Sequence, residues 1–426
     1  MTFRETAPST RAIESLNYTS ATREILAGGL PMYVCPPRPL GVLKLQFYWP
    51  TGTAQQPAPM VARATNILRL SGNKHLTSEQ IQEGFEYLGA SVGMDVGLNE
   101  STLTLQAQEE TLIEALQWLL KEGQDPVFPD EELAIYKQVE TAGLLRRMQT
   151  PRYWSSRECM ESLYGIGSPD GTFSNPEDIE ALQAATLQYW FTTNLGLGMS
   201  TVFVSGDANA KLQEKLRLVL GGINSQEQAP TIITTNTQGL KNQVIKHPLE
   251  QSSQASMYLA RTLPEMDMRT LQLASLVNMF LGGFFGSRLM QDLRETRGLT
   301  YGIGSGISPS SNGYTWYVSG EMNSSNADAA LEATLEIMKN IASNPPSGDE
   351  LDKAKRYAAG QMRAGFDGPF ALPRKIQFLL QRGFDEQYYT SYMDTLWSIS
   401  SEEISQFADN YLQPEAFTIA LAGKLN

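Results

Sequence analysis

The sequence predicts an α+β fold of two homologous domains, each an antiparallel sheet with helices packed on one face. Three observations lead to this prediction. The chain has 426 residues, more than the roughly 250–300 residues that one hydrophobic core usually serves. Short apolar runs bounded by glycine and proline alternate with segments of helical period. The same order of elements then starts again after a polar segment near the middle.

The first half contains clear helix signals. Residues 57–70 carry proline near the first turn and apolar residues at three- and four-residue spacing. Thr77 with Gln80 is a capping-box pattern, so a helix begins there and ends before Gly89. Further helices are expected at 109–121, 129–148, 152–163 and 176–193, and strands at 30–35, 42–49, 90–98, 101–108 and 201–205.

The second half follows the segment 225–239, which is polar, lacks helical period and contains a proline. This segment is the predicted linker between domains at 1–224 and 240–426. Expected strands are 243–246, 255–263, one from Thr300 to about 307, 313–320 and 417–421, and expected helices are 267–281, 287–297, 327–343, 348–366, 372–383 and 401–411.

The two halves also align without gaps. At an offset of 217 residues, the strand 201–206 falls on 418–423, with threonine and glycine at its two ends in both copies. At an offset of 209, EYLGASVGM falls on ETRGLTYGI, so Glu86 and Gly89 meet Glu295 and Gly298. At two positions an apolar residue in the first half aligns with a polar residue in the second. The first half has Phe85 and Val92 where the second has a polar pair, Arg294 and Tyr301. Packing alone does not require such a pair.

Composition narrows the class of protein. Hydrophobic residues at 41% and charged residues at 19% are ordinary globular values. The net charge of −13 argues against nonspecific nucleic-acid binding. Cys35 and Cys159 are expected to be buried free thiols. No apolar leader or segment of 18 apolar residues is present, which predicts a cytoplasmic protein without membrane contact. A leader removed from the natural chain would instead allow a periplasmic location.

The residues offer few catalytic groups. His75 and His247 are the two histidines, they are far apart, and both are expected at the surface. Gly302, Gly304 and Gly306 alternate within a strand pattern, so they do not form a phosphate-binding loop. A strand without side chains on one face can accept a peptide as an added strand, although tight helix packing explains the glycines equally well. The predicted peptide-contacting residues are Gly302, Ile303, Gly304 and Ser305.

A family resemblance enters at residues 281–308, LGGFFGSRLMQDLRETRGLTYGIGSGIS. This stretch closely resembles the C-terminal signature of the pitrilysin-type, or insulinase-type, zinc peptidases and of mitochondrial processing peptidase. SNPEDIEAL at 174–182 and the strands TVFVSGD and TIALAGK extend the resemblance over nearly the whole chain. The resemblance implies that Arg294 and Tyr301 contact the substrate backbone and stabilise the tetrahedral oxyanion. A guanidinium and a phenol are donors suited to that task.

The sequence departs from the family at the metal site. Members that hold zinc carry H-x-x-E-H on the first long helix, and those positions fall here on residues 63–67, with Arg63, Asn66 and Ile67 at the three functional places. The distal glutamate is expected near Gly143 or Leu144, and Glu140 is the nearest carboxylate. Without the metal no hydroxide is generated at neutral pH, so this chain is expected to bind no zinc.

The resemblance implies a function for a chain of this kind. It predicts a zinc-free subunit of a heterodimeric metallopeptidase, inactive alone, whose homologous partner carries H-x-x-E-H and the zinc and closes with it as a clamshell around a peptide substrate. Two alternatives stay open: a structural scaffold homologue without a proteolytic role, and a stand-alone peptide-binding module. The isolated chain is also a candidate homodimer.

Overall fold

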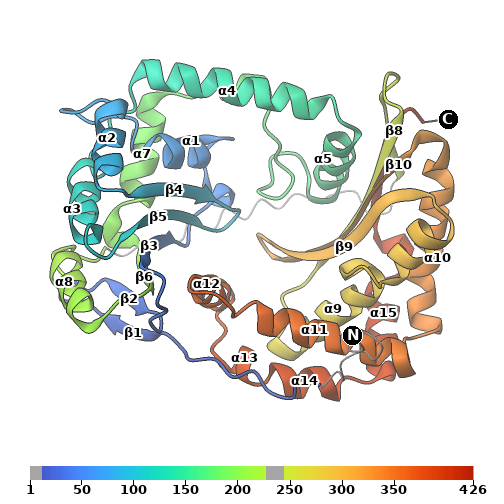
Figure 1. Ribbon diagram of the computed structural model, residues 1–426. Helices are drawn as coiled ribbons and strands as arrows, with labels where there is room; N and C mark the ends of the chain where they lie inside the picture. The colour runs from blue at the N-terminus through green and yellow to red at the C-terminus, as the bar shows by residue number, and fades with distance from the viewer. Residues whose placement is uncertain (1–11, 227–243, 426) are drawn as a thin grey trace, which may run out of the picture.

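A computed structural model describes residues 12–226 and 244–425, and it contains two sheets that lie in the two halves of Figure 1. The first sheet has the strand order β1-β2-β6-β3-β5-β4 and the second the order β7-β11-β8-β10-β9. The strands of the first sheet are β1 Thr22–Ile25, β2 Pro31–Val34, β3 Val42–Trp49, β4 Ser91–Val96, β5 Ser101–Gln108 and β6 Thr201–Gly206. Those of the second are β7 Val244–Pro248, β8 Gln254–Leu263, β9 Thr300–Ser310, β10 Gly313–Asn323 and β11 Thr418–Gly423.

The strand orders show the internal duplication. Without β1, both sheets have the same order, and the last strand of each half lies between the first two. The returning strand pairs in parallel with the first strand, as β6 does with β2 and β11 with β7, and antiparallel with its other neighbour. The α+β fold of two similar halves is therefore confirmed. Each sheet is mixed rather than purely antiparallel, because that last strand arrives by a long helical connection.

The helices follow the predicted pattern with local differences. Those before residue 227 are α1 Val61–Leu68, α2 Ser78–Tyr87, α3 Leu112–Glu122, α4 Asp130–Met148, α5 Pro151–Tyr164, α6 Pro176–Glu180, α7 Ala184–Asn194 and α8 Ala210–Leu220. Those after residue 243 are α9 Met268–Asn278, α10 Ala327–Ser343, α11 Gly348–Ala364, α12 Leu372–Arg382, α13 Gln387–Thr390, α14 Tyr392–Ser398 and α15 Ser401–Tyr411. The predictions did not include β1, α8, α13 or α14.

Local sequence signals account for several helix ends. The capping box before α2 is confirmed: the Thr77 hydroxyl accepts the Gln80 N–H at 3.3 Å, and the Gln80 side chain accepts the Thr77 N–H at 3.0 Å. The single helix predicted for 176–193 is wrong. It is divided into α6 and α7 because Leu182 turns into the core and Gln183 adopts extended dihedral angles.

The main cores lie on one face of each sheet. Along β3, Leu43, Leu45 and Phe47 face the core of the first half and are fully buried. Lys44 and Gln46 alternate with them and point to the opposite face, as the two-residue period of a strand requires. That opposite face of each sheet receives a helix from the other half of the sequence.

Helix α5 packs on the second sheet, although it precedes residue 227. The Cys159 thiol donates to the Thr418 carbonyl at 3.2 Å, Ser155 bonds to Ser256 at 3.0 Å, and Leu163 joins an apolar cluster with Ala260 of β8. Figure 1 shows α5 beside β8 and β10, away from the first sheet.

Helix α12 makes the reciprocal contact with the first sheet. Gln377 donates to Gln46 at 2.8 Å, and Ile376 packs with Tyr48 and Phe203. At the offset of 217 residues α12 overlaps α5, so the duplicated helices are exchanged. Packing therefore interlocks the halves. The boundaries at 224 and 240 remain a prediction, and residues 227–239 of the predicted linker lie outside the described part of the chain.

The two cysteines and the two histidines lie in different environments. Cys35 and Cys159 are buried free thiols, as expected. His75 is exposed, whereas His247 is half-buried, with Nδ1 3.0 Å from Glu158 Oε1 and its ring stacked on Trp154. Within the described residues, no helix is both long and apolar enough to cross a bilayer.

The duplication also places two equivalent glycines under the same constraint. Gly206 has φ +104°, and a Cβ there would lie 2.4 Å from the Val42 carbonyl oxygen. Gly423 has φ +135°, and its Cβ would lie 2.6 Å from the Gln254 carbonyl oxygen. We expect Gly206→Ala and Gly423→Ala each to lower the free energy of unfolding by about 2–4 kcal/mol, measured by chemical denaturation.

The matched control is Gly93→Ala. Gly93 also lies in a strand, and a Cβ there would meet nothing within 4 Å. It should change the free energy of unfolding by less than about 1 kcal/mol. If all three variants were equally stable, the close backbone approach would not constrain these positions.

Candidate active-site element

The segment from α9 to β9 contains two π-helical turns, η3 Met279–Gly283 and η4 Met290–Thr296. The helix predicted for 287–297 is present, but most of it is wound as a π-helix. Gly298 ends it at φ +61°, just as Gly89 follows α2 at φ +59°, which supports the alignment of the two halves. π-helical turns are rare and are frequently found at functional sites, so the winding makes this segment a candidate site.

Arg294 occupies the helix position at which the first half has Phe85, and the two side chains have different surroundings. Phe85 is buried in the first core, whereas the Arg294 side chain is 42% exposed. The Arg294 guanidinium lies over the Phe285 ring at 5.3 Å, and its Nε lies 3.6 Å from Glu295 Oε1. The guanidinium is thus only loosely held and remains accessible to a ligand.

Tyr301 lies at an irregularity in β9. Gly302 pairs with Glu321 and Thr300 with Met322, so Tyr301 is an extra residue at a β-bulge. The Thr300 hydroxyl accepts the Gly302 N–H at 3.1 Å and donates to the Glu321 carbonyl at 2.5 Å, which fixes the bulge. Bulges redirect side chains and are common beside active sites.

The bulge turns Tyr301 outward. Its side chain is 63% exposed, and its hydroxyl donates to Asn323 Oδ1 at 3.0 Å. The equivalent Val92 pairs with Leu105 in the regular register of β4. Arg294 and Tyr301 make no hydrogen bond or cation–π contact with each other in the described structure, so they are two separate donors at the start of β9.

Strand β9 is the last strand of its sheet, and in the described part of the chain no strand pairs with its outer edge. A Cβ on Gly302 would meet nothing within 4 Å. Gly282 of η3 lies against the next part of the strand, because a Cβ on Gly282 would be 2.6 Å from the Ser305 nitrogen. The Ile303 side chain is buried in the core. The open part of β9 is therefore at Gly302, next to Tyr301.

Asn278 supports β9 from the end of α9, and its role was not evident from the sequence. Its Oδ1 accepts the Ser305 hydroxyl at 2.7 Å and the Trp316 indole N–H at 2.9 Å, and its Nδ2 donates to the Ser305 carbonyl at 3.3 Å. No sequence signal identified this residue, because its partners come from two other elements.

The positions of the degenerate zinc motif lie on α1. Arg63 donates to Glu140 of α4 at 3.3 Å, and the Glu140 side chain is only 14% exposed. Asn66 is buried, and its Nδ2 donates to the backbone carbonyls of Asp95 and Thr102. Ile67 is partly exposed.

These residues do not fit a zinc ion. A cationic guanidinium already pairs with the one nearby carboxylate, the amide nitrogen is engaged by the backbone, and isoleucine has no ligand atom. The predicted distal position near Gly143 or Leu144 supplies no ligand, since Leu144 is a buried core residue. Across the described ranges, no three His, Cys, Asp or Glu side chains are grouped as metal ligands would be.

Comparison with known proteins agrees with this geometry. Residues 181–357 match the family described as peptidase M16 inactive domain. This part of the chain is therefore similar to an M16 inactive domain. The resemblance to pitrilysin-type and insulinase-type peptidases is thereby confirmed. Those residues include η4 and β9, so Arg294 and Tyr301 lie within the matched domain.

Similar proteins extend the likeness over nearly the whole chain. A Helicobacter pylori protein named "Non-peptidase homolog YmxG" is 23% identical over 388 residues, which are 90% of this chain and 89% of that protein. A solved M16 inactive domain from Pseudomonas fluorescens has 23% identity and a TM-score of 0.83, covering 95% of this chain and 98% of the other. A solved Helicobacter pylori protease has 14% identity and a TM-score of 0.84, with 95% and 100% covered. The structural likenesses confirm the M16 fold.

The Arg63–Glu140 pair gives a testable expectation for this M16 fold. We expect Arg63→Ala to lower the free energy of unfolding by about 1 kcal/mol, because it leaves a largely buried carboxylate unpaired. Chemical denaturation of Arg63→Ala, Glu140→Gln and the double variant would measure the coupling. A double variant as destabilised as the sum of the single variants would show that the two side chains do not interact.

Proposed function

We propose that this chain is the zinc-free subunit of a heterodimeric metallopeptidase that cleaves peptides or unfolded protein segments. In this proposal a homologous partner carries H-x-x-E-H and the zinc ion. Arg294 and Tyr301 of this chain complete the partner's active site, and the open part of β9 at Gly302 contacts the substrate backbone.

The observation that carries the proposal is the contrast between the two halves. At the metal positions, the Arg63–Glu140 ion pair and the buried Asn66 leave no ligand set. At the β9 end, a bulge exposes Tyr301 beside a strand edge that pairs with no other described strand. A chain that had lost all catalytic function would gain nothing from an exposed phenol and guanidinium in place of Val92 and Phe85.

The chemistry of these two groups supports the proposed role. The Tyr301 hydroxyl and the Arg294 guanidinium are hydrogen-bond donors that suit the negative charge developing on a carbonyl oxygen during peptide hydrolysis. In the structure the Tyr301 hydroxyl donates to Asn323, so substrate binding would exchange this partner for the substrate oxygen. The outer edge of β9 pairs with no other strand of the described chain, so it can align an extended peptide as an added strand, with the substrate replacing the Thr300 hydroxyl at Gly302.

The test uses the full chain and, as the partner, an H-x-x-E-H homologue sought in the same genome, purified separately and together. We expect a 1:1 complex by size-exclusion chromatography, zinc in the homologue but not in this chain, and hydrolysis of a fluorogenic unstructured peptide only by the complex. Stoichiometric zinc on the isolated chain, or full activity of the homologue alone, would contradict the proposal.

A structural scaffold is the second candidate function. It is favoured by the name of the Helicobacter pylori relative, "Non-peptidase homolog". The same reconstitution separates the two, since a scaffold would form a complex whose peptide hydrolysis is unchanged when Arg294 or Tyr301 is replaced.

A further inference from the structure

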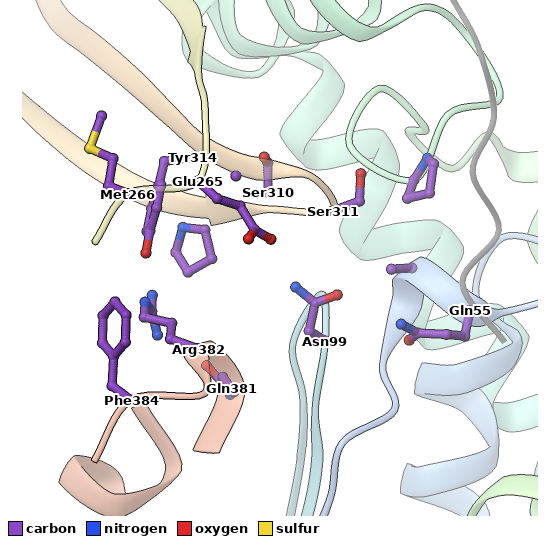
Figure 2. Close-up of a pocket in the computed structure, with 14 residues that line it drawn as sticks. Gln55, Asn99, Glu265, Met266, Ser310, Ser311, Tyr314, Gln381, Arg382 and Phe384 are labelled. Carbon is purple, nitrogen blue, oxygen red and sulfur yellow. The ribbon is translucent and has the colours of Figure 1, made fainter. Parts of the chain in front are cut away.

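A cavity of about 310 Å³ lies where the two halves meet, away from the residues of the proposed peptidase site. Its lining comes from both halves of the chain. The first half contributes Gln55 and Asn99, the latter in the turn between β4 and β5. The second half contributes Glu265 after β8, Tyr314 of β10 and Arg382 at the end of α12. Figure 2 shows Glu265 entering from one side and Arg382 and Asn99 from the opposite side.

Arg382 carries a positive charge that no described carboxylate meets in an ion pair. Its Nη1 donates to the Phe378 carbonyl at 3.3 Å, and its guanidinium lies over the rings of Phe378 at 3.9 Å and Tyr314 at 5.6 Å. Its Nε is buried and has no hydrogen-bond partner among the described residues. No ion pair joins Arg382 to a carboxylate in the described part of the chain. A guanidinium with unused donors between aromatic rings is suited to bind a carboxylate.

Nearby carboxylates do not satisfy this charge. Glu100 interacts electrostatically with Arg382, but its Oε2 already accepts the Gln381 amide at 3.0 Å, and burial raises the pKa of Glu100. Glu265 is exposed at the rim of the cavity and forms no ion pair among the described residues. The cavity therefore presents one cation and one anion that do not neutralise each other.

The rest of the lining is suited to a small polar molecule. The Gln55 side-chain oxygen Oε1 accepts the Gly52 N–H at 2.8 Å, which leaves the side-chain nitrogen Nε2 as a donor. Asn99 adds a second amide, and Met266, Tyr314 and Phe384 provide apolar surface. A cavity of this size is at the lower end of the roughly 300–1,000 Å³ typical of small-molecule sites.

We infer that this cavity binds a small zwitterion, an α-amino acid or a dipeptide. Its carboxylate pairs with Arg382, its ammonium group with Glu265, and its side chain packs against Tyr314 and Phe384. Because the lining comes from both halves, the bound ligand joins them. The inference is independent of the peptidase proposal, since it uses neither Arg294 nor Tyr301.

The test uses the full chain with glycyl-leucine and with free leucine. Isothermal titration calorimetry measures binding, and thermal denaturation measures the melting temperature with and without each ligand. We expect a saturable heat and a higher melting temperature with at least one of them, and comparing the two shows whether the site takes an amino acid or a dipeptide. N-acetylation or C-amidation of the preferred ligand should weaken binding about tenfold or more, since each removes one charged pair.

Variants of the lining residues test which residue binds the ammonium group of the ligand and which binds its carboxylate. Glu265→Gln should weaken binding of the zwitterion about tenfold and leave binding of the N-acetylated ligand unaffected. Arg382→Gln should remove the preference for carboxylate over amide, and Asn99→Ala provides a second lining variant that does not alter the Phe378 contact. Glu110→Gln, an exposed carboxylate elsewhere, is the control and should change nothing. No heat with either ligand at millimolar concentration, or binding that is indifferent to both blocking groups and to Glu265→Gln, would overturn the inference.

Discussion

Tyr301→Phe is expected to lower kcat/KM of the reconstituted complex by roughly 100-fold or more, which is the usual loss when one oxyanion donor is removed. The substitution removes only the hydroxyl, and the exposed ring leaves the fold unchanged. Arg294→Gln should cause a loss of similar size, because it removes the guanidinium that the proposal assigns as the second donor to the oxyanion. Steady-state hydrolysis of a fluorogenic peptide measures both effects.

The control for this prediction is Tyr189→Phe. Tyr189 is 67% exposed on α7 and lies far along the chain from β9. It should leave kcat/KM unchanged. If Tyr301→Phe behaved like this control while the complex stayed intact and active, the assigned role of Tyr301 would be wrong. A rise in KM alone would instead indicate that Tyr301 contributes to substrate binding and not to the chemical step.

Asn278→Ala is expected to lower the free energy of unfolding by about 3 kcal/mol, the cost of leaving buried polar groups without partners. Trp316 is fully buried, and its indole N–H donates to Asn278 Oδ1 at 2.9 Å. The same variant removes both bonds to Ser305, which hold β9 against η3. Chemical denaturation measures the loss, and amide hydrogen exchange should show faster opening of β9.

Ser275→Ala is the matched control on the same helix. The Ser275 hydroxyl donates only to the Leu271 carbonyl of its own helix, so its removal should cost less than about 1 kcal/mol. Equal stability of the two variants would mean that Asn278 does not anchor β9. Loss of peptidase activity in Asn278→Ala at temperatures where the complex remains folded would show that the position of β9 matters for function.

Much of the fold could be predicted because its signals are local. Proline and glycine positions, the Thr77–Gln80 capping box and the two-residue alternation of β3 depend on neighbouring residues. The duplication could be found for the same reason, and the nearly equal φ angles of Gly89 and Gly298 show that the offset is correct. The long helix predicted for 176–193 was wrong because the tertiary burial of Leu182 interrupts a pattern that is helical on both sides.

The candidate site, like the fold, could be predicted from the sequence only in part. The sequence by itself determined that the chain is duplicated, that Arg294 and Tyr301 are the added polar pair, and that the metal ligands are missing. Only the tertiary structure decided that Tyr301 occupies a bulge beside an unpaired edge, that Arg63 pairs with Glu140, and that α5 and α12 are exchanged between the sheets. These features depend on contacts between residues distant in sequence, and a pattern of neighbouring side chains carries no information about which surfaces meet.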